Sequence, residues 1–159
     1  MIEVLLADYR NPVHARAVVD LLDSYARDPA GGGTALAPEV LAGLPEALAG
    51  RPQAFSVLAY DGAQAVGLVN CIEGFSTFAC KPLVNVHDVV VLPSHRGQRI
   101  TQHMFACVEQ EARARGACKL TLEVLSANHS ALRAYVREGF ANFQLDPAFG
   151  QAMFLQKKL

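Results

Sequence analysis

The chain has 159 residues, a formal net charge of −1 and charged side chains at 18% of its positions, while 52% of its residues are apolar. These values describe one soluble globular domain over residues 1–159 with a sizeable core, and they exclude a disordered chain. A charge so close to zero gives no basic surface for nucleic acid or a membrane, and no apolar run is long enough to cross a bilayer. The opening MIEVLLADYRN also lacks the order of a secretory signal, so we expect a cytoplasmic protein.

The cysteines and histidines do not have the spacing of a metal site. Cys71, Cys80, Cys107 and Cys118 form no C-x-x-C pair, and the five histidines form no H-x-x-x-H pair. We expect reduced cysteines that act as small buried hydrophobic side chains, and no metal.

The first third of the chain predicts one strand and two helices. Ile2–Leu6 is a short apolar run typical of a strand, and Asn11-Pro12 is an N-cap followed by a first-turn proline, which predicts a helix to Arg27. Three glycines, Gly31–Gly33, form either a plain mobile linker or a loop that lies close to a ligand. A weaker helix begins at Pro38 and is expected to be kinked or divided at Pro45.

A β-hairpin follows. Ala54–Tyr60 and Ala65–Ile72 have the pattern of strands, and Asp61-Gly62 between them is a strong turn signal. The next stretch, Glu73–Lys81, carries two aromatic residues and is either a connector or a wall of a pocket.

The centre of the chain predicts a phosphate-binding loop. Val84–Leu92 is a buried strand stopped by Pro93, and apolar residues then recur at helical spacing from Ile100 until Gly116. The turn between them contains Arg96, Gly97 and Arg99. The first turn of a helix offers unpaired backbone N–H groups and the positive end of the helix dipole, to which these arginines add full charges.

The last third predicts a strand, a helix and two final strands. The strand Lys119–Val124 is followed by a helix that Asn128 caps and Gly139 ends. Phe140–Leu145 and Ala152–Gln156 are predicted as the last two strands. The order β-α-α-β-β-β-α-β-α-β-β indicates an α/β layered domain with a mixed central β-sheet and helices on both faces.

Two sequence blocks resemble the GNAT acyltransferase superfamily. The pyrophosphate loop of that family, Q/R-x-x-G-x-G/A, corresponds to Arg96–Thr101, although Arg99 and Thr101 stand where the family usually has small residues. The second block, N-x-x-A-x-x-x-Y-x-x-x-G-F, corresponds to Asn128–Phe140 and includes Tyr135. The blocks cover Val84–Phe140 in the order and spacing of the family.

The resemblance implies a three-layer GNAT-like fold and acetyl-CoA as the acyl donor. It also implies that the strand before the loop splays from its neighbour, so that its backbone pairs with the pantetheine arm of the donor and one N–H faces the thioester oxygen. The residues that it assigns to donor binding are Val89, Val90, Val91, Arg96, Gly97, Gln98, Arg99, Ile100, Thr101 and Asn128.

The same resemblance suggests the catalytic residues Tyr135 and Asp88. A thiol with a pKa of about 8.5 is a better leaving group than a phenol of about 10, so Tyr135 needs only to donate a hydrogen bond or a late proton. An amine with a pKa of about 10.4 must lose a proton before it attacks. Asp88, a carboxylate in an apolar strand, is the first candidate base, followed by His87 and Glu73. Asp88 is equally interpretable as a structural hydrogen-bonding residue.

The sequence thus indicates an N-acetyltransferase that transfers the acetyl group of acetyl-CoA to a small amine, as a monomer or homodimer. The alternatives are a GNAT-like module that senses coenzyme A without turnover and a protein-modifying acetyltransferase. We expect the acceptor pocket between Gly31–Gly33 and the aromatic pair Phe75 and Phe78.

Overall fold

The computed structural model describes residues 1–143 and 145–159, which form two compact units, Met1–Leu122 and Glu123–Leu159. The first unit contains all five strands of one sheet together with three α-helices. Its elements are β1 (Ile2–Leu6), α1 (Pro12–Arg27), α2 (Pro38–Ala49), β2 (Ala54–Asp61), β3 (Gln64–Ser76), β4 (Lys81–Val91), α3 (Ile100–Ala114) and β5 (Leu120–Leu122). The second unit contains α4 (His129–Arg137). No helix of the described residues combines the length and apolar character needed to cross a bilayer.

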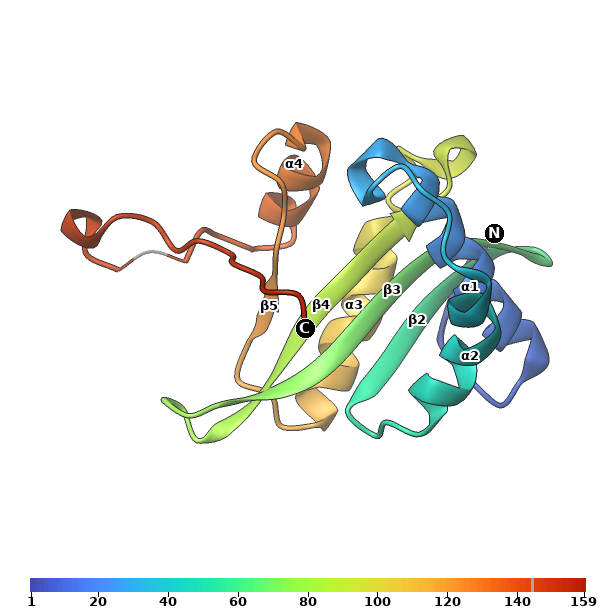
Figure 1. Cartoon of the computed structure of the whole chain (residues 1–159), viewed down its shortest axis with the longest axis horizontal. Helices are drawn as coiled ribbons and strands as arrows, with labels where there is room; N and C mark the ends of the chain where they lie inside the picture. Colours follow the sequence, from blue (N-terminus) through green and yellow to red (C-terminus); the bar gives the residue numbers. More distant parts are fainter. Residues whose placement is uncertain (144) are drawn as a thin grey trace. The chain divides into compact units, whose positions relative to one another are not determined.

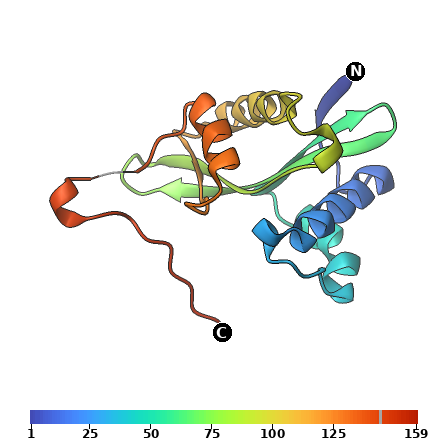
Figure 2. The same ribbon diagram turned by 90° about the horizontal axis from the view of Figure 1, so that it is seen from above.

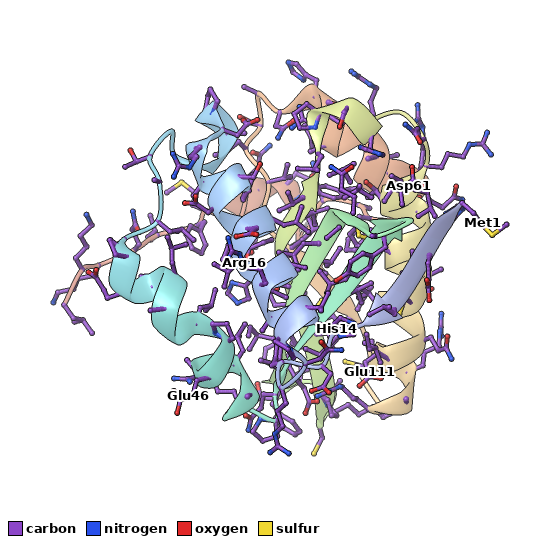
Figure 3. The ribbon with its side chains drawn as sticks, turned by 90° about the vertical axis from the view of Figure 1, so that its right-hand side faces the viewer. Met1, His14, Arg16, Glu46, Asp61 and Glu111 are labelled. Carbon is purple, nitrogen blue, oxygen red and sulfur yellow. The ribbon has the colours of Figure 1, made fainter. Side chains whose placement is uncertain are left out.

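The sheet is mixed, as predicted. Its strands lie in the order β1-β2-β3-β4-β5, with antiparallel pairing from β1 through β4 and a parallel pair between β4 and β5. At one edge, the amino group of Met1 lies 3.2 Å from Oδ1 of Asp61, which joins the start of β1 to the end of β2 (Figure 3). The pair Ser76↔Lys81 closes a long hairpin between β3 and β4. Most of the predicted connector Glu73–Lys81 is therefore strand.

Helices cover both faces of this sheet, as Figures 1 and 2 show. On one face, Val18 and Leu21 of α1 pack against Leu58, Leu68 and Val90 of three neighbouring strands. On the other face lies α3, whose most deeply buried side chains are Met104, Phe105 and Val108. The three layers predicted from the sequence are thus present in residues 1–122, with β4 between two helical layers.

Local signals place the helix ends where the sequence predicts them. The side chain of Asn11 accepts a hydrogen bond from the N–H of Val13 and caps α1, which ends at Arg27. The second helix is continuous over Pro38–Ala49, so Pro45 does not divide it. Proline removes one helical hydrogen bond, and Leu48 in the turn that follows packs against the core cluster that includes Val18 and Leu21 of α1.

The glycine run after α1 has a structural explanation. A Cβ at Gly31 would lie 2.0 Å from the carbonyl oxygen of Tyr25, so no side chain can be placed there. Gly32 and Gly33 have φ angles of 118° and 76°, which L residues with a side chain rarely adopt. The run therefore closes the end of α1 tightly, in contrast to a plain linker.

The two last strands predicted from the sequence are wrong. In the second unit Asn128 caps α4 by accepting from the N–H of Ala131, as expected. After α4, the described residues of the segments 140–145 and 152–156 form no strand, and Gln144 lies outside the described residues. Phe143, Phe154 and Leu155 are 67%, 76% and 78% exposed. An apolar pattern makes a strand only when another strand edge accepts its backbone hydrogen bonds, and no strand of the described residues pairs with these segments.

Candidate functional site

The sheet opens between β4 and β5. The strand β5 pairs only with Val84, Asn85 and Val86, and from His87 to Val91 this edge of β4 has no strand partner in the described residues. The register with β3 shifts at the same point, because Asn70 lies opposite Asp88 while Cys71 lies opposite Val86. His87 is the additional residue of this β-bulge. A bulge bends and twists its strand, so β4 diverges from β5 after this point.

The open edge presents backbone groups of the predicted donor-binding strand. The N–H of Leu92 donates to the carbonyl oxygen of Val66 at 2.9 Å, so it points toward β3. Directions alternate along a strand, and the N–H groups of Val89 and Val91 therefore point toward the open edge. The carbonyl oxygen of Val91 points to the same edge as its N–H. It accepts a hydrogen bond from Nε of Arg96 at 3.2 Å, and no strand in the described part of the chain occupies that side.

The loop 96–101 follows this edge directly and leads into α3. Within the described part of the chain, the backbone N–H groups of residues 97–102 have no hydrogen-bond acceptor, and the first bond of α3 runs from His103 to Arg99. Gly97 has a φ of 80°. These amides and the positive end of the helix dipole form an arrangement that suits a phosphate group. The structure thus brings the whole predicted loop together beside Val89–Val91.

Arg99 occupies an unusual backbone position. It is the N-cap of α3 with φ 60° and ψ 19°, the left-handed region, and its side chain does not cap the helix. This conformation costs a residue with a Cβ about 1–2 kcal/mol. The position therefore favours glycine, and here it carries an exposed arginine.

Arg96 is held at the end of α1. Its Nη2 lies 3.4 Å from Oδ2 of Asp28, the residue that follows α1. The pKa of the Asp28 carboxyl is lowered mainly by the hydrogen bond from the N–H of Ala30. The guanidinium of Arg96 lowers it further. The end of α1 thus lies beside the loop that follows β4.

Asp88 lies on the open stretch of β4 and is half-buried. Its Oδ2 accepts a hydrogen bond from Nδ2 of Asn70 at 3.0 Å. Burial, and then the charges of Asp88 and Asp28, raise the pKa of the Tyr25 phenol on α1. Two carboxylates and a phenol therefore gather near the end of α1. From the sequence, Tyr25 is predicted only as part of the apolar face of its helix.

The two other candidate bases have different surroundings. His87 is exposed and has no Cα partner in β3. Glu73 lies opposite Val84, where β4 is still paired with β5, and its Oε2 is 3.2 Å from Nη1 of Arg115. That ion pair gives Glu73 a structural role away from the open edge.

The acceptor pocket expected from the sequence is wrong in its location. Gly31–Gly33 lie at the end of α1, which Asp28 joins to the loop after β4, whereas Phe75 pairs with Pro82 at the beginning of β4. The strand Lys81–Val91 separates these points, and at about 3.3 Å per residue it spans roughly 30 Å. The glycine loop and the aromatic pair cannot line one small pocket.

Asn128 and Tyr135 belong to the second compact unit. Oδ1 of Asn128 accepts from the N–H of Ala131 at 3.1 Å, so this residue caps α4. The Tyr135 ring is half-buried and meets Phe140 edge to face, with 6.0 Å between ring centroids. The motif N-x-x-A-x-x-x-Y-x-x-x-G-F thus has a local structural basis in the cap, the helix and the ring contact.

Sequence reasoning missed a line of polar side chains across the sheet. Ser56 and Asn70 are 1% and 8% exposed, and they connect Tyr9 with Asp88 through hydrogen bonds. The available signal was that both residues interrupt otherwise apolar strands.

An open strand edge beside a helix terminus with unpaired N–H groups is an arrangement that suits a phosphorylated donor lying along the sheet. The family model of the "Acetyltransferase (GNAT) family" matches residues 15–140. The chain therefore belongs to the GNAT acetyltransferase family.

Two curated relatives and one solved structure illustrate the similarity. The chain is 38% identical over 90 residues to streptothricin acetyltransferase of Streptomyces lavendulae, a match that covers 55% of this chain and 48% of the relative. It is 32% identical over 83 residues to aminoalkylphosphonate N-acetyltransferase of Salmonella typhimurium, covering 52% of this chain and 54% of the relative. The chain spans about half the length of these curated relatives.

The structure of AAC(6')-Iy in complex with the bisubstrate analogue CoA-S-monomethyl-acetylneamine has the same fold. It superposes with a TM-score of 0.79, covers 100% of this chain and 99% of its own, and is 15% identical in sequence.

Proposed function

We propose that this protein transfers the acetyl group of acetyl-CoA to the amine of a small-molecule acceptor, by direct attack of the amine on the thioester. The observation that supports this function is the open edge of β4 directly before the loop 96–101. Acetyl-CoA supplies an activated acetyl group and a diphosphate by which it can be held. Both structural elements that such a donor requires lie next to each other in residues 87–102.

The loop and the strand have separate tasks in holding the donor. The amides of residues 97–102, with Arg96 and Arg99, bind the diphosphate, and Gln98, Ile100 and Thr101 complete the loop. The edge of Val89, Val90 and Val91 pairs with the pantetheine arm, and the outward N–H of Val89 stabilises negative charge on the thioester oxygen. The N–H of Val91 lies next to the carbonyl group that Arg96 occupies, so Val89 is the better donor.

Proton transfer requires a base for the amine and an acid for the thiolate. We assign the base to Asp88, because it is the carboxylate on the open stretch of β4, and the acid to Tyr135. Asn128 holds α4 in place through its cap and contributes to donor binding.

The acceptor is proposed to be a small amine that is positively charged before it reacts. The carboxylates of Asp88 and Asp28, which both act on Tyr25, support a cationic acceptor near the end of α1. A small acceptor agrees with the names of the similar proteins, which are a streptothricin acetyltransferase, an aminoalkylphosphonate N-acetyltransferase and a structure with a CoA-S-monomethyl-acetylneamine bisubstrate analogue.

An assay with a panel of amines tests this function. Release of free thiol from acetyl-CoA is followed with small amines, polyamines and lysine peptides at several pH values. Turnover with a small amine is the expected result. Tight acetyl-CoA binding without turnover on any amine would instead identify a coenzyme A sensor, and turnover on peptides alone would identify a protein-modifying enzyme.

Two variants test the catalytic assignments. Asp88→Asn is expected to lose the acidic limb of the pH–rate profile, and Tyr135→Phe to lower kcat at least tenfold with donor affinity within twofold. Glu73→Gln is the control carboxylate. If the acidic limb persists in Asp88→Asn and disappears in Glu73→Gln, the base assignment is wrong.

A further inference from the structure

A line of hydrogen-bonded side chains runs across three strands and ends at Asp88. The hydroxyl groups of Tyr9 and Ser56 are 2.8 Å apart, Ser56 Oγ donates to Asn70 Oδ1 at 2.6 Å, and Asn70 Nδ2 donates to Asp88 Oδ2 at 3.0 Å. Ser56 lies opposite Asn70, which lies opposite Asp88, so the line follows cross-strand neighbours of β2, β3 and β4.

The middle of this line is buried among apolar residues. Ser56 and Asn70 are 1% and 8% exposed, while the neighbouring positions Val57, Leu68 and Val69 are all at 0%. A buried polar group costs free energy unless its hydrogen bonds are made. The two residues meet this requirement only by bonding to each other and to the groups at either end.

The hydrogen bonds have one consistent direction. Ser56 has a single hydroxyl proton and donates it to Asn70, so the phenol of Tyr9 is the donor to Ser56. The amide oxygen of Asn70 is thereby directed to Ser56 and its NH₂ to Asp88. The reversed amide would place an oxygen against the carboxylate of Asp88. The ionised carboxylate and the serine proton thus select the same orientation of Asn70.

The line leaves one oxygen of Asp88 available. Oδ2 is bonded to Asn70, and Oδ1 has no hydrogen-bond partner in the described part of the chain. Rotating the carboxylate would break the bond to Asn70. The orientation of Oδ1 is therefore set by a residue on the neighbouring strand.

We propose that Asn70 is a positioning residue that fixes the orientation of the Asp88 carboxylate and directs Oδ1 toward the acceptor amine, while Ser56 and Tyr9 hold Asn70. This inference rests on the proposed role of Asp88 as the base. Asn70 does not contact the reacting atoms. It acts through the carboxylate, because its N–H binds Oδ2 and thereby sets the direction of Oδ1.

The other titratable groups around Asp88 do not replace this contact. Tyr25 faces it from α1, and its phenol stays neutral because burial and the nearby carboxylates raise its pKa. Cys71 follows Asn70 on β3, and burial raises its pKa to about 12, so it also stays neutral. His87 adjoins Asp88 on β4 and is exposed. Asn70 is thus the residue that donates a hydrogen bond to the carboxylate in the described chain.

The variant Asn70→Asp provides the sharpest test. It keeps the shape of the side chain and an oxygen that accepts from Ser56, and it replaces the N–H donor by a second carboxylate. We expect kcat at pH 7 to fall at least tenfold, the acidic limb to move at least one pH unit higher, and donor affinity to stay within twofold. Ser56→Ala keeps the N–H and should cause at least a threefold smaller loss of kcat.

A purely structural role for Asn70 would give a different result. It would lower the unfolding midpoint of Asn70→Asp and leave kcat of the folded enzyme at its pH optimum unchanged, which would overturn the proposal. An equal loss of kcat in Ser56→Ala and Asn70→Asp would also contradict it, because the N–H donor would then not be the decisive group.

A measurement without substrates separates this proposal from the proposed function. In the ligand-free protein, the side-chain NH₂ of Asn70 is followed by ¹H–¹⁵N NMR and assigned by its absence in Asn70→Asp. One proton should exchange with solvent at least tenfold more slowly than the other, and Asp88→Ala should remove this difference. Equal exchange in the wild type would overturn the positioning contact. Wild-type turnover of Asp88→Asn with slow exchange intact would overturn only the assignment of the base.

Discussion

Arg96 and Asp28 are 68 positions apart in the chain, yet Nη2 of the arginine lies 3.4 Å from Oδ2 of the aspartate. This ion pair joins the loop after β4 to the end of α1. Its side chains are 60% and 32% exposed, so solvent screens the pair and we expect it to add little to the stability of the fold. A weak contact of this kind can be exchanged for a phosphate when the donor binds.

The first prediction is that Asp28→Asn increases the affinity for acetyl-CoA about two- to fivefold. Asparagine keeps the oxygen that accepts from the N–H of Ala30, and it removes the charge that competes with phosphate for Arg96. Isothermal titration calorimetry at low salt measures the change. Arg96→Gln should weaken binding at least fivefold and flatten its salt dependence.

Asp20→Asn is the matched control. Asp20 lies on the same helix, carries the same charge and pairs with Arg16 on an exposed surface, so its loss should leave donor affinity unchanged. Weaker binding in Asp28→Asn would mean that the carboxylate positions Arg96 for the donor.

The second prediction concerns the tight end of α1. Gly31→Ala should destabilise the protein by about 2 kcal/mol or more, because its Cβ would overlap the backbone carbonyl of Tyr25. Urea unfolding of the full chain measures the change. Gly43→Ala is the control, since Gly43 lies inside α2 with nothing within 4 Å of its added Cβ, and alanine should stabilise that helix by up to about 1 kcal/mol. Equal effects at the two positions would show that the loop rearranges freely.

The third prediction is a pH dependence of stability that comes from Asp23. Its Oδ1 accepts from the N–H of Leu36 at 2.8 Å and its Oδ2 from Arg27 at 2.9 Å. The hydrogen bond from Leu36 has the larger effect and that from Arg27 the smaller one, and together they hold the pKa of Asp23 below 3.8. The folded form then binds its proton less readily than the unfolded form, so the stabilisation is present above pH 3.8 and is lost as the pH falls through the folded pKa.

Asp23→Asn should therefore be less stable than the wild type at neutral pH and approach it as the pH falls through the lowered folded pKa. Urea midpoints measured from pH 7 to pH 2 give the two curves, with Asp20→Asn as the control for removing an exposed carboxylate. A constant difference in urea midpoint between the wild type and Asp23→Asn across this pH range would exclude a charge-dependent contribution of Asp23 to stability.

Features that follow from neighbouring residues could be predicted from the sequence, and features that join distant strands could not. Asn11 and Pro12 start α1 through contacts within one turn, and the loop at Gly97 follows from a strand, a turn and a helix in succession. The bulge at His87 depends on the pairing of β3 with β4. The contact of Asn70 with Asp88 depends on that register as well, so no local pattern indicates it.

The C-terminal segment shows that local patterns can also predict elements that do not form. Its apolar residues predict two strands, but a strand also requires a neighbouring edge, and sequence patterns do not report whether one is available. The acceptor pocket was misplaced for a related reason. Gly31–Gly33 and Phe75 both adjoin the sheet, and only the topology shows that they adjoin opposite ends of β4.

The last prediction uses Arg99, whose left-handed backbone and exposed charge should give two effects of opposite sign. Arg99→Gly relieves a φ of 60° that costs a residue with a Cβ about 1–2 kcal/mol, partly offset by the larger entropy of glycine in the unfolded chain. We expect a net stabilisation of up to about 1 kcal/mol. The same change removes a charge at the phosphate loop, so acetyl-CoA should bind several-fold more weakly, with a flatter salt response.

Arg99→Gln separates these effects, because it removes the charge and keeps a side chain at the left-handed position. It should weaken donor binding as much as Arg99→Gly and give no gain in stability. Calorimetric titration of acetyl-CoA at low and high salt measures the donor affinity of both variants. Urea unfolding measures their stability. If Arg99→Gly binds the donor more tightly at every salt concentration, the arginine obstructs the diphosphate, and the role assigned to it in donor binding is wrong.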